Sequence, residues 1–273
     1  MSDGQSLEAV FLGIIQGVTE FLPISSSAHL LITPWLLGWQ SLGLTFDVVV
    51  HGGTLVASIL YFKDYWKQFI YQFIKLFIGK SKHQFQFFWA LFVGTIPAVV
   101  VGWLFEDIIR IYLRSPIVVV CTLCGFGLVL WWSDQHSSHE RSLDSISWRD
   151  GLLVGLAQAL ALVPGVSRSG VTISAALLLG ISRADAARFS FLLGTPILLV
   201  ITSKSLYELG QSGVGVDLHV SSLVIGAICS FISGYLCIRY FLKFLQVRTY
   251  QIFVVYRLAL AGFILLLLVV GRL

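Results

Sequence analysis

Two short polar stretches, each containing a proline, interrupt apolar sequence and hold the residue types that can do chemistry. The first is QGVTEFLPISSSAH at residues 16–29, and the second is PGVSRSGVT at residues 164–172. The first stretch offers a carboxylate, hydroxyls and an imidazole, which suit acid–base, nucleophilic and metal chemistry. The second offers glycines, hydroxyls and an arginine, which suit the binding of an anion.

The carboxylate of the first stretch, Glu20, lies four residues after Gln16, so both side chains share one face of a helix. A carboxylate is costly to keep in apolar surroundings unless a partner compensates its charge. We therefore expect Glu20 to bind a metal ion, to pair with a cationic group or to take part in acid–base chemistry. A structural ion pair with an arginine is the alternative.

The serines and the histidine around the first proline form a second candidate group. A helix that restarts after Pro23 would use Ser25 as its N-cap. Ser26 and His29 would then lie three residues apart on one helix face, as a nucleophile and its base can. The alternative is that the serines only cap backbone groups, and Ser27 is also a candidate phosphate contact.

The second stretch predicts a phosphate-binding site at the start of a helix. Its glycines let the backbone approach a ligand closely, and its hydroxyls add hydrogen-bond donors. Arg168 offers a planar fork that fits phosphate oxygens, and the free N–H groups of a helix start would point at the same anion. An ion pair between Arg168 and Glu20 is compatible with this site. The expected phosphate-binding residues are Gly165, Ser167, Arg168, Ser169, Gly170 and Thr172.

Polar residues in other apolar segments are weaker candidates. Asp47 and His51 are four residues apart beside a Gly-Gly-Thr sequence, and they could line a cavity or extend the site. Arg257 is expected to be a boundary charge or a charge that pairs helices. The basic, aromatic stretch 65–77 is expected to lie along the cytoplasmic membrane interface.

The composition decides which class of protein must position these residues. The chain has 273 residues, of which 57% are hydrophobic and 12% are charged, whereas an average soluble domain carries about 25% charged residues. Together with a mean hydropathy of +0.88, this excludes a disordered chain and favours an integral membrane protein over a soluble domain. The net charge of +4 fits basic cytoplasmic loops rather than nucleic-acid binding.

The long apolar runs predict an all-α integral membrane protein, because they lack the short alternating pattern of membrane barrels. Six runs are long enough, or nearly so, to cross a bilayer, and the short fourth run could extend back through residues 182–188. The six runs are 44–62, 85–105, 116–132, 189–202, 221–238 and 252–270.

Two further regions, 8–38 and 151–181, contain the polar stretches and are expected to be re-entrant helical hairpins. Irregular backbone at membrane depth is tolerated only where protein buries it or where it lines a wet cavity. The hairpins belong to an internal repeat, because the GxxQ, PxxS and GT motifs recur after 141 or 142 residues. We expect one membrane domain, 1–273, of two inverted repeats, about 8–132 and about 150–270.

Lysine and arginine residues orient this topology, because they are enriched in cytoplasmic loops. Loop 63–84, which holds five lysines, is expected to be cytoplasmic, and loops 133–150 and 239–251 then fall on the same side. Loops 106–115 and 203–220, and both termini, would lie outside. This consistency depends on the second hairpin not crossing the membrane.

At both polar stretches the sequence resembles the bacterial undecaprenyl-pyrophosphate phosphatase family, which is associated with bacitracin resistance. The matching patterns are QxxxEFLPxSSxxH at 16–29 and PGxSRSGxT at 164–172, and the resemblance covers the whole chain in length and order. It implies hydrolysis of the lipid carrier undecaprenyl pyrophosphate to its monophosphate and inorganic phosphate. The carrier then serves again in peptidoglycan synthesis.

The resemblance also implies roles for single residues. Glu20 and His29 match catalytic positions of the family, and Ser26 matches the proposed nucleophile. Attack by water, with His29 as base, is the open alternative. Gln16 stands where the family has Glu or Gln, so a metal held by Gln16 and Glu20 would have one carboxylate fewer. The residues that match phosphate contacts are Arg168, Ser167 and Thr172.

The resemblance further implies a divalent cation, Mg²⁺ or Ca²⁺, and a site that opens to the periplasmic side of the bacterial inner membrane. The prenyl tail of the lipid substrate would lie among membrane lipids between helices. The inverted repeat supports a function of another class as the alternative, a lipid-carrier flippase or transporter. The chain could also form a homodimer, and no nucleic-acid partner is expected.

Overall fold

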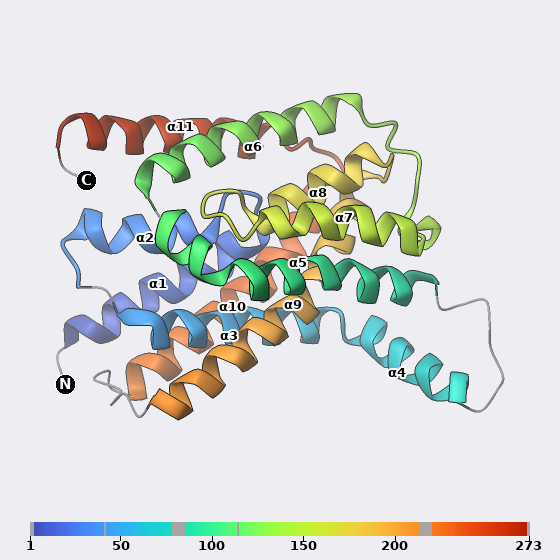
Figure 1. Cartoon of the computed structure of the whole chain (residues 1–273), viewed down its shortest axis with the longest axis horizontal. Coiled ribbons are helices and arrows are strands. Elements are labelled where there is room, and N and C mark those ends of the chain that lie inside the picture. The colour runs from blue at the N-terminus through green and yellow to red at the C-terminus, as the bar shows by residue number, and fades with distance from the viewer. Residues whose placement is uncertain (1–2, 41, 78–85, 114, 213–219, 272–273) are drawn as a thin grey trace.

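The protein is all-helical, as its sequence predicts (Figure 1). The computed structural model describes residues 3–40, 42–77, 86–113, 115–212 and 220–271, which contain eleven α-helices and one 3-10 turn. The α-helices are α1 (Asp3–Phe21), α2 (Ser26–Leu37), α3 (Gly43–Tyr61), α4 (Lys63–Phe77), α5 (Gln86–Tyr112), α6 (Pro116–His136), α7 (Trp148–Leu160), α8 (Arg168–Leu178), α9 (Arg183–Ser212), α10 (Val220–Phe244) and α11 (Gln251–Val269).

Within the described residues, six helices are long and apolar enough to cross a membrane, and each overlaps one of the six predicted runs. The fourth helix differs most from its predicted run, because α9 begins at Arg183 rather than at residue 189. Ser182 precedes this start, and its hydroxyl oxygen accepts a hydrogen bond from the Asp185 amide at 3.4 Å. The predicted extension of the short run is therefore confirmed. The candidate spans are Gly43–Tyr61, Gln86–Phe105, Pro116–His136, Arg183–Glu208, Val220–Phe244 and Gln251–Val269.

Helix α4 lies at one end of the molecule (Figure 1), where its Phe69 ring packs against Phe88 of α5 with ring centroids 4.8 Å apart. It covers the basic, aromatic stretch 65–77, and its Lys75 ammonium lies 4.4 Å from the centre of the Tyr71 ring. Apolar and basic side chains on one helix suit a position along a membrane interface. Lys80 and Lys82, which contribute to the prediction of a cytoplasmic loop, lie outside the described residues.

Two close helix crossings hold the bundle together and resemble each other. Helix α1 packs against α10 where Gly13 faces Gly226, and α7 packs against α5 where Gly155 faces Gly94. At both crossings a Cβ on the glycine would collide with the backbone of the facing helix. Small residues let helices approach closely in a lipid environment, where van der Waals packing replaces the hydrophobic drive. Gly155 lies 142 residues after Gly13, which matches the spacing of the sequence motifs.

The end of the molecule that carries α4 also collects the loops before α7, α9 and α11 (Figure 1). Here the buried Asp134 accepts hydrogen bonds from Arg183 Nε at 2.6 Å and from the Tyr250 amide at 3.0 Å. Burial raises the pKa of Asp150 nearby, but hydrogen bonds from Arg141 and from the N-cap of α7 outweigh it and lower the pKa to about 2. These loops are the ones predicted to share the cytoplasmic side, and their sidedness stays a prediction.

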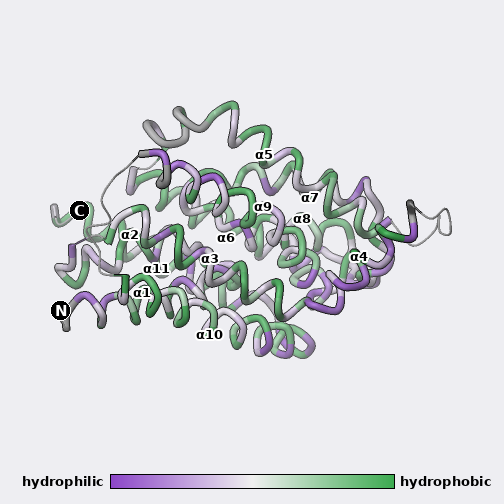
Figure 2. Tube along the Cα trace, turned by 90° about the horizontal axis from the view of Figure 1, so that it is seen from below, coloured by the Kyte–Doolittle hydropathy of each residue, from purple (hydrophilic) through white to green (hydrophobic). Residues whose placement is uncertain are grey.

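The outer faces of the bundle are apolar, as a lipid-facing surface requires. Phe92, Trp103 and Val255 are examples of large hydrophobic side chains that are more than half exposed. Figure 2 shows hydrophobic residues along most helices, with hydrophilic residues densest on α4 and around its end of the molecule. A soluble protein rarely exposes apolar patches of this extent.

Candidate active site

A cavity of about 180 Å³ lies where the two polar stretches meet. Its polar lining comes from the starts of α2 and α8, from the end of α1 and from α3, and its apolar wall comes mainly from α5 and α9. The polar lining residues include Glu20, Ser26, Ser27, His51, Ser167 and Arg168, and the apolar wall includes Ala98, Ile197, Leu198 and Ile201. The structure therefore brings the predicted carboxylate, hydroxyls and arginine to one space.

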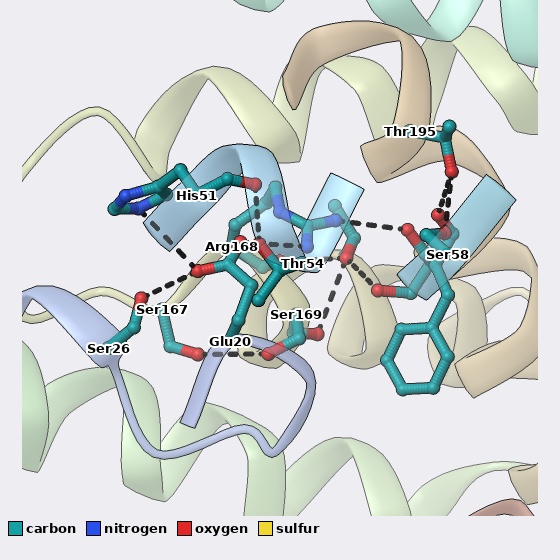
Figure 3. A network of polar contacts seen from close by, with 12 residues as sticks. Glu20, Ser26, His51, Thr54, Ser58, Ser167, Arg168, Ser169 and Thr195 are labelled. Atoms are coloured by element: carbon teal, nitrogen blue, oxygen red, sulfur yellow. Dashed lines mark hydrogen bonds and ion pairs between the residues drawn. The ribbon is translucent and has the colours of Figure 1, made fainter. Parts of the chain in front are cut away.

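Glu20, in the last turn of α1, is buried and fully paired (Figure 3). Its Oε2 accepts hydrogen bonds from Gln16 Nε2 at 3.1 Å and from Ser26 Oγ at 2.8 Å. Its Oε1 accepts a hydrogen bond from Arg168 Nη2 at 3.1 Å. A buried carboxylate is stable only with such partners. The expected ion pair between the two stretches is present, and it joins residues 148 positions apart.

Arg168, the first residue of α8, keeps part of its donor capacity. Its Nη1 donates to the carbonyl oxygen of Ser190 at 3.3 Å, whereas its buried Nε has no hydrogen-bond partner in the described part of the chain. A Cβ at Gly194 would overlap the guanidinium, so glycine leaves the space that the arginine needs. The Arg168 side chain lines the cavity, so its positive charge faces the space that an anion could occupy.

The turns before α2 and α8 share an unusual backbone. Ser25 and Ser167, the N-cap residues, have φ angles of 74° and 70°, in the region that normally favours glycine. Ser167 lies 142 residues after Ser25. The Ser25 hydroxyl lies 3.1 Å from that of Ser27, and the Ser167 hydroxyl lies 3.2 Å from that of Ser169. Strained backbone of this kind concentrates at functional sites.

Ser25 occupies the N-cap position of α2, as the sequence predicts. Its side chain makes no cap hydrogen bond, and its hydroxyl contacts that of Ser27 instead. Ser167 does cap α8, since its Oγ accepts a hydrogen bond from the Gly170 amide at 3.2 Å. Both turns line the cavity, so the two predicted helix starts meet there. Helix N-termini attract anions.

Two histidines near the site hold their Nδ1 atoms alike. The Nδ1 atoms of His29 and His51 each lie 2.7 Å from the carbonyl oxygen four residues earlier, which belongs to Ser25 and Asp47 respectively. Because a carbonyl oxygen only accepts, each Nδ1 carries a hydrogen. The two rings differ in the groups that their Nε2 atoms contact.

His29 Nε2 lies 2.6 Å from the hydroxyl of Tyr256, and the two rings are stacked. His51 Nε2 lies 3.8 Å from Glu20 Oε2, and His51 lines the cavity. Ser26 gives its hydrogen bond to Glu20, so the expected pairing of Ser26 with His29 is not formed. The catalytic role of His29 stays a prediction.

Comparison with known proteins identifies the family. The family model described as bacitracin resistance protein BacA matches residues 9–263. Undecaprenyl-diphosphatase 2 of Stutzerimonas stutzeri is 46% identical over 265 residues, which cover 96% of this chain and 97% of the relative. The undecaprenyl-diphosphatase of Chromohalobacter salexigens is 47% identical over 261 residues, which cover 95% and 97%. The chain belongs to the BacA family.

In this BacA-family protein, several predicted phosphate contacts have protein partners and do not line the cavity. Thr172 Oγ1 donates to the carbonyl oxygen of Arg168 at 2.7 Å, and Ser169 Oγ donates to the carbonyl oxygen of Leu22 at 3.0 Å. These contacts shape the turn and attach it to the first hairpin. A phosphate-binding role stays a prediction for the four residues concerned, which are Gly165, Ser169, Gly170 and Thr172.

The residues fit a divalent cation only if the substrate completes its coordination. The described residues contain no group of three or more His, Cys, Asp or Glu side chains that could hold a metal ion. Mg²⁺ is often held by one or two carboxylates plus phosphate oxygens of the substrate, and Glu20 supplies one carboxylate at the cavity. Gln16 Oε1 is a buried oxygen without a hydrogen-bond partner among the described residues, but Gln16 does not line the cavity, so its role as a metal ligand stays a prediction.

Sequence reasoning missed the role of Arg257 in the BacA-family site. Arg257 was expected to be a boundary charge or to pair helices, but its guanidinium contacts the backbone of both polar turns. The sequence does contain one indication of this role, which is a single arginine inside the apolar run 252–270. An ionisable residue at membrane depth is costly and therefore suggests a function. Ser190, whose carbonyl accepts from Arg168, gave no comparable signal.

Proposed function

We propose that this protein is a membrane phosphatase that hydrolyses undecaprenyl pyrophosphate to undecaprenyl phosphate and inorganic phosphate. One observation carries the proposal: a hydroxyl, a carboxylate and an arginine side chain line one cavity together with the starts of two helices. The names of the two relatives support this substrate. Recycling of the lipid carrier for peptidoglycan synthesis would then confer resistance to bacitracin.

Ser26 is the proposed nucleophile, because its hydroxyl already donates a hydrogen bond to Glu20 at 2.8 Å. In the first step Ser26 Oγ attacks the terminal phosphorus, its proton passes to Glu20, and the bond to the bridging oxygen breaks. Undecaprenyl phosphate leaves. Water then hydrolyses the phosphoserine and releases inorganic phosphate. Direct attack by water on the terminal phosphorus is the alternative mechanism. Acid quenching during turnover would distinguish the two mechanisms, because only attack by Ser26 traps phosphate on that serine.

Arg168 and the two helix starts are the proposed diphosphate-binding groups. The guanidinium of Arg168 and the free N–H groups at the starts of α2 and α8 would donate to phosphate oxygens. Ser27 and Ser167 would add hydroxyls from the cavity wall. Donors fixed in advance around developing negative charge are worth far more in a site that excludes water than in solution.

His51 and a divalent cation complete the proposed mechanism. His51 Nε2, at 3.8 Å from Glu20 Oε2, is placed to receive the proton that Glu20 takes from Ser26. Glu20 and Gln16 would hold the cation, Mg²⁺ or Ca²⁺. When bound, the cation would supply positive charge to the phosphate oxygens.

The apolar wall of the cavity is the proposed path for the prenyl tail. Ile197, Leu198 and Ile201 of α9 and Ala98 of α5 line the cavity, and Ile201 is also exposed on the outer surface. A tail that follows these side chains would reach the lipid-facing surface, while the diphosphate stays at the polar turns. An insoluble substrate could therefore react without leaving the membrane.

We also propose that α1–α2 and α7–α8 are re-entrant hairpins of an inverted repeat whose cavity opens to the periplasm. The shared turn geometry at Ser25 and Ser167 supports this, as does the exchange of partners in which α1 packs on α10 and α7 on α5. Single-cysteine variants test the sidedness. Ser142→Cys should react with an impermeant thiol reagent from the cytoplasmic side only, and Gly38→Cys from the periplasmic side only.

Phosphate release by the purified protein tests the proposed activity. Wild-type protein should release phosphate from undecaprenyl pyrophosphate, whereas Glu20→Ala and Arg168→Ala should lose turnover while they elute as monodisperse protein in detergent. Arg188→Ala is the control, because it removes an arginine that pairs with Asp185 outside the cavity. Normal turnover in either cavity variant would refute the assignment.

A lipid-carrier flippase remains the second candidate, because the two similar turns allow a two-fold arrangement around one site. It predicts that proteoliposomes move the carrier lipid across the bilayer without hydrolysis. Movement that persists in Ser26→Ala, together with no phosphate release by the wild type, would favour it. The homodimer also stays a prediction, which the mass of the detergent-solubilised protein checks.

A further inference from the structure

Arg257, in the middle of the apolar helix α11, has no exposed surface. It is the largest fully buried side chain among the described residues, and in that part of the chain its guanidinium forms no ion pair. A charge buried without a carboxylate partner is costly, so other groups must compensate it. The mechanism proposed above does not use this residue.

Backbone carbonyl oxygens surround the guanidinium and use all five of its N–H groups. Nε donates to Leu123 at 3.1 Å, and Nη2 donates to Thr122 at 3.1 Å and to Gly165 at 3.0 Å. Nη1 donates to Pro23 at 3.2 Å and to Val166 at 3.1 Å. An arginine has five such donors, so none is left over.

The acceptors belong to both polar turns at once. Pro23 lies between α1 and α2, whereas Gly165 and Val166 lie between α7 and α8. Nη1 alone bridges the two turns, because it bonds to one carbonyl from each. Irregular backbone at membrane depth leaves carbonyls without helical partners, and Arg257 satisfies them.

These turns also carry the groups that must act together on the substrate. Glu20 and Ser26 flank the first turn, and Ser167 and Arg168 end the second. The carbonyl groups that Arg257 binds lie in the connections between the two helices of each hairpin, α1 to α2 and α7 to α8. The guanidinium thus lies at the base of both turns.

We propose that Arg257 is a positioning residue that sets the distance between the nucleophile turn and the arginine turn. It acts through Pro23 on one side and through Gly165 and Val166 on the other, and it does not line the cavity. This inference rests on the proposed phosphatase function, because positioning matters only if both turns act on one diphosphate. A displacement of 1 Å between reacting groups can cost about 100-fold in rate.

Kinetic measurements on Arg257→Gln and Arg257→Lys test the proposal. Arg257→Gln should lower kcat per folded molecule about 100-fold with a much smaller change in KM, because each turn can still bind phosphate but the two are misaligned. Arg257→Lys keeps the charge and should recover part of kcat. Arg183→Gln is the control, because Arg183 also makes several hydrogen bonds but binds Asp134 near the other end of α6.

The amides of Ile24 and Val166 provide a readout that needs no activity. Each is hydrogen-bonded within its own turn, to Leu22 and Val163 respectively. Hydrogen exchange of both amides should accelerate in Arg257→Gln, and neither should accelerate in Arg183→Gln. If Arg257→Gln does not fold, the same two measurements on Arg257→Lys decide the matter.

Several outcomes would overturn the proposal. Arg257 variants that lose thermal stability but keep wild-type kcat per folded molecule would show a purely structural role. Faster exchange in neither turn, or in one turn only, would show that Arg257 does not link them. If wild-type protein releases no phosphate, the proposed function fails, and the exchange measurement alone still decides whether Arg257 couples the turns.

Discussion

The two hairpins α1–α2 and α7–α8 share one backbone shape at their turns but carry different chemistry. In each turn a serine with positive φ precedes the second helix, and its hydroxyl lies close to that of the serine two residues later. The residue between the two serines is Ser26 in the first hairpin and Arg168 in the second. The same shape thus places a hydroxyl on one side of the cavity and a cation on the other.

The equivalence of the two turns differs from the one that the sequence motifs suggest. Both Ser26 and Ser167 follow a proline by three residues, whereas the backbone makes Ser25 equivalent to Ser167. The reason is the length of the turns, because residues 22–25 connect the first pair of helices and residues 161–167 connect the second. The positive φ angle, and not the proline, marks the equivalent positions.

The largest expected effect comes from the chemical difference between the two turns, which is the Ser26 hydroxyl in the first hairpin. Ser26→Ala should lower kcat about 1,000-fold or more, because it removes the hydroxyl that attacks phosphorus. Ser27→Ala should lower it about tenfold, because it removes one of several donors to the diphosphate. Phosphate release under saturating substrate measures both. A similar, small loss in the two variants would mean that water attacks directly.

His29 and His51 can be compared directly, because the Nδ1 atom of each contacts a backbone carbonyl oxygen four residues earlier. His51→Gln should lower kcat about tenfold to 100-fold and change the pH profile of kcat/KM, because it removes an imidazole that would exchange a proton with Glu20. His29→Gln should act through the contact with Tyr256, so it should lower stability and leave the shape of the profile unchanged. A profile that changes only in His29→Gln would return the catalytic role to His29.

Much of the fold and part of the site could be predicted from the sequence. The six spans followed from apolar length, and the meeting of Glu20 with Arg168 followed from the cost of a buried charge. The partner of His29 could not be predicted, because Tyr256 is 227 residues away and aromatic residues are common in apolar helices. The contacts of Arg257 could not be predicted for a different reason, because its partners are backbone carbonyl groups, which every residue has.

The two hairpins pack through similar close helix crossings, so equivalent glycine substitutions should lower stability equally in both. Gly13→Ala and Gly155→Ala should each lower the free energy of unfolding by about 1–3 kcal/mol, because each Cβ would push apart a close helix crossing. Gly262→Ala is the control, because nothing lies within 4 Å of a Cβ there. Unfolding in mixed detergent micelles measures all three. A large loss at one crossing only would contradict the similarity of the crossings.

The smallest expected effect is a difference in stability between variants of the two serines with positive φ. Ser167→Ala should lower the free energy of unfolding by about 1 kcal/mol, because it removes the cap on the Gly170 amide. Ser25→Ala removes no cap, so its loss should be smaller, although its φ angle is as strained as that of Ser167. The same micelle titration compares the pair. Equal losses would mean that backbone strain, and not capping, sets the stability of both turns.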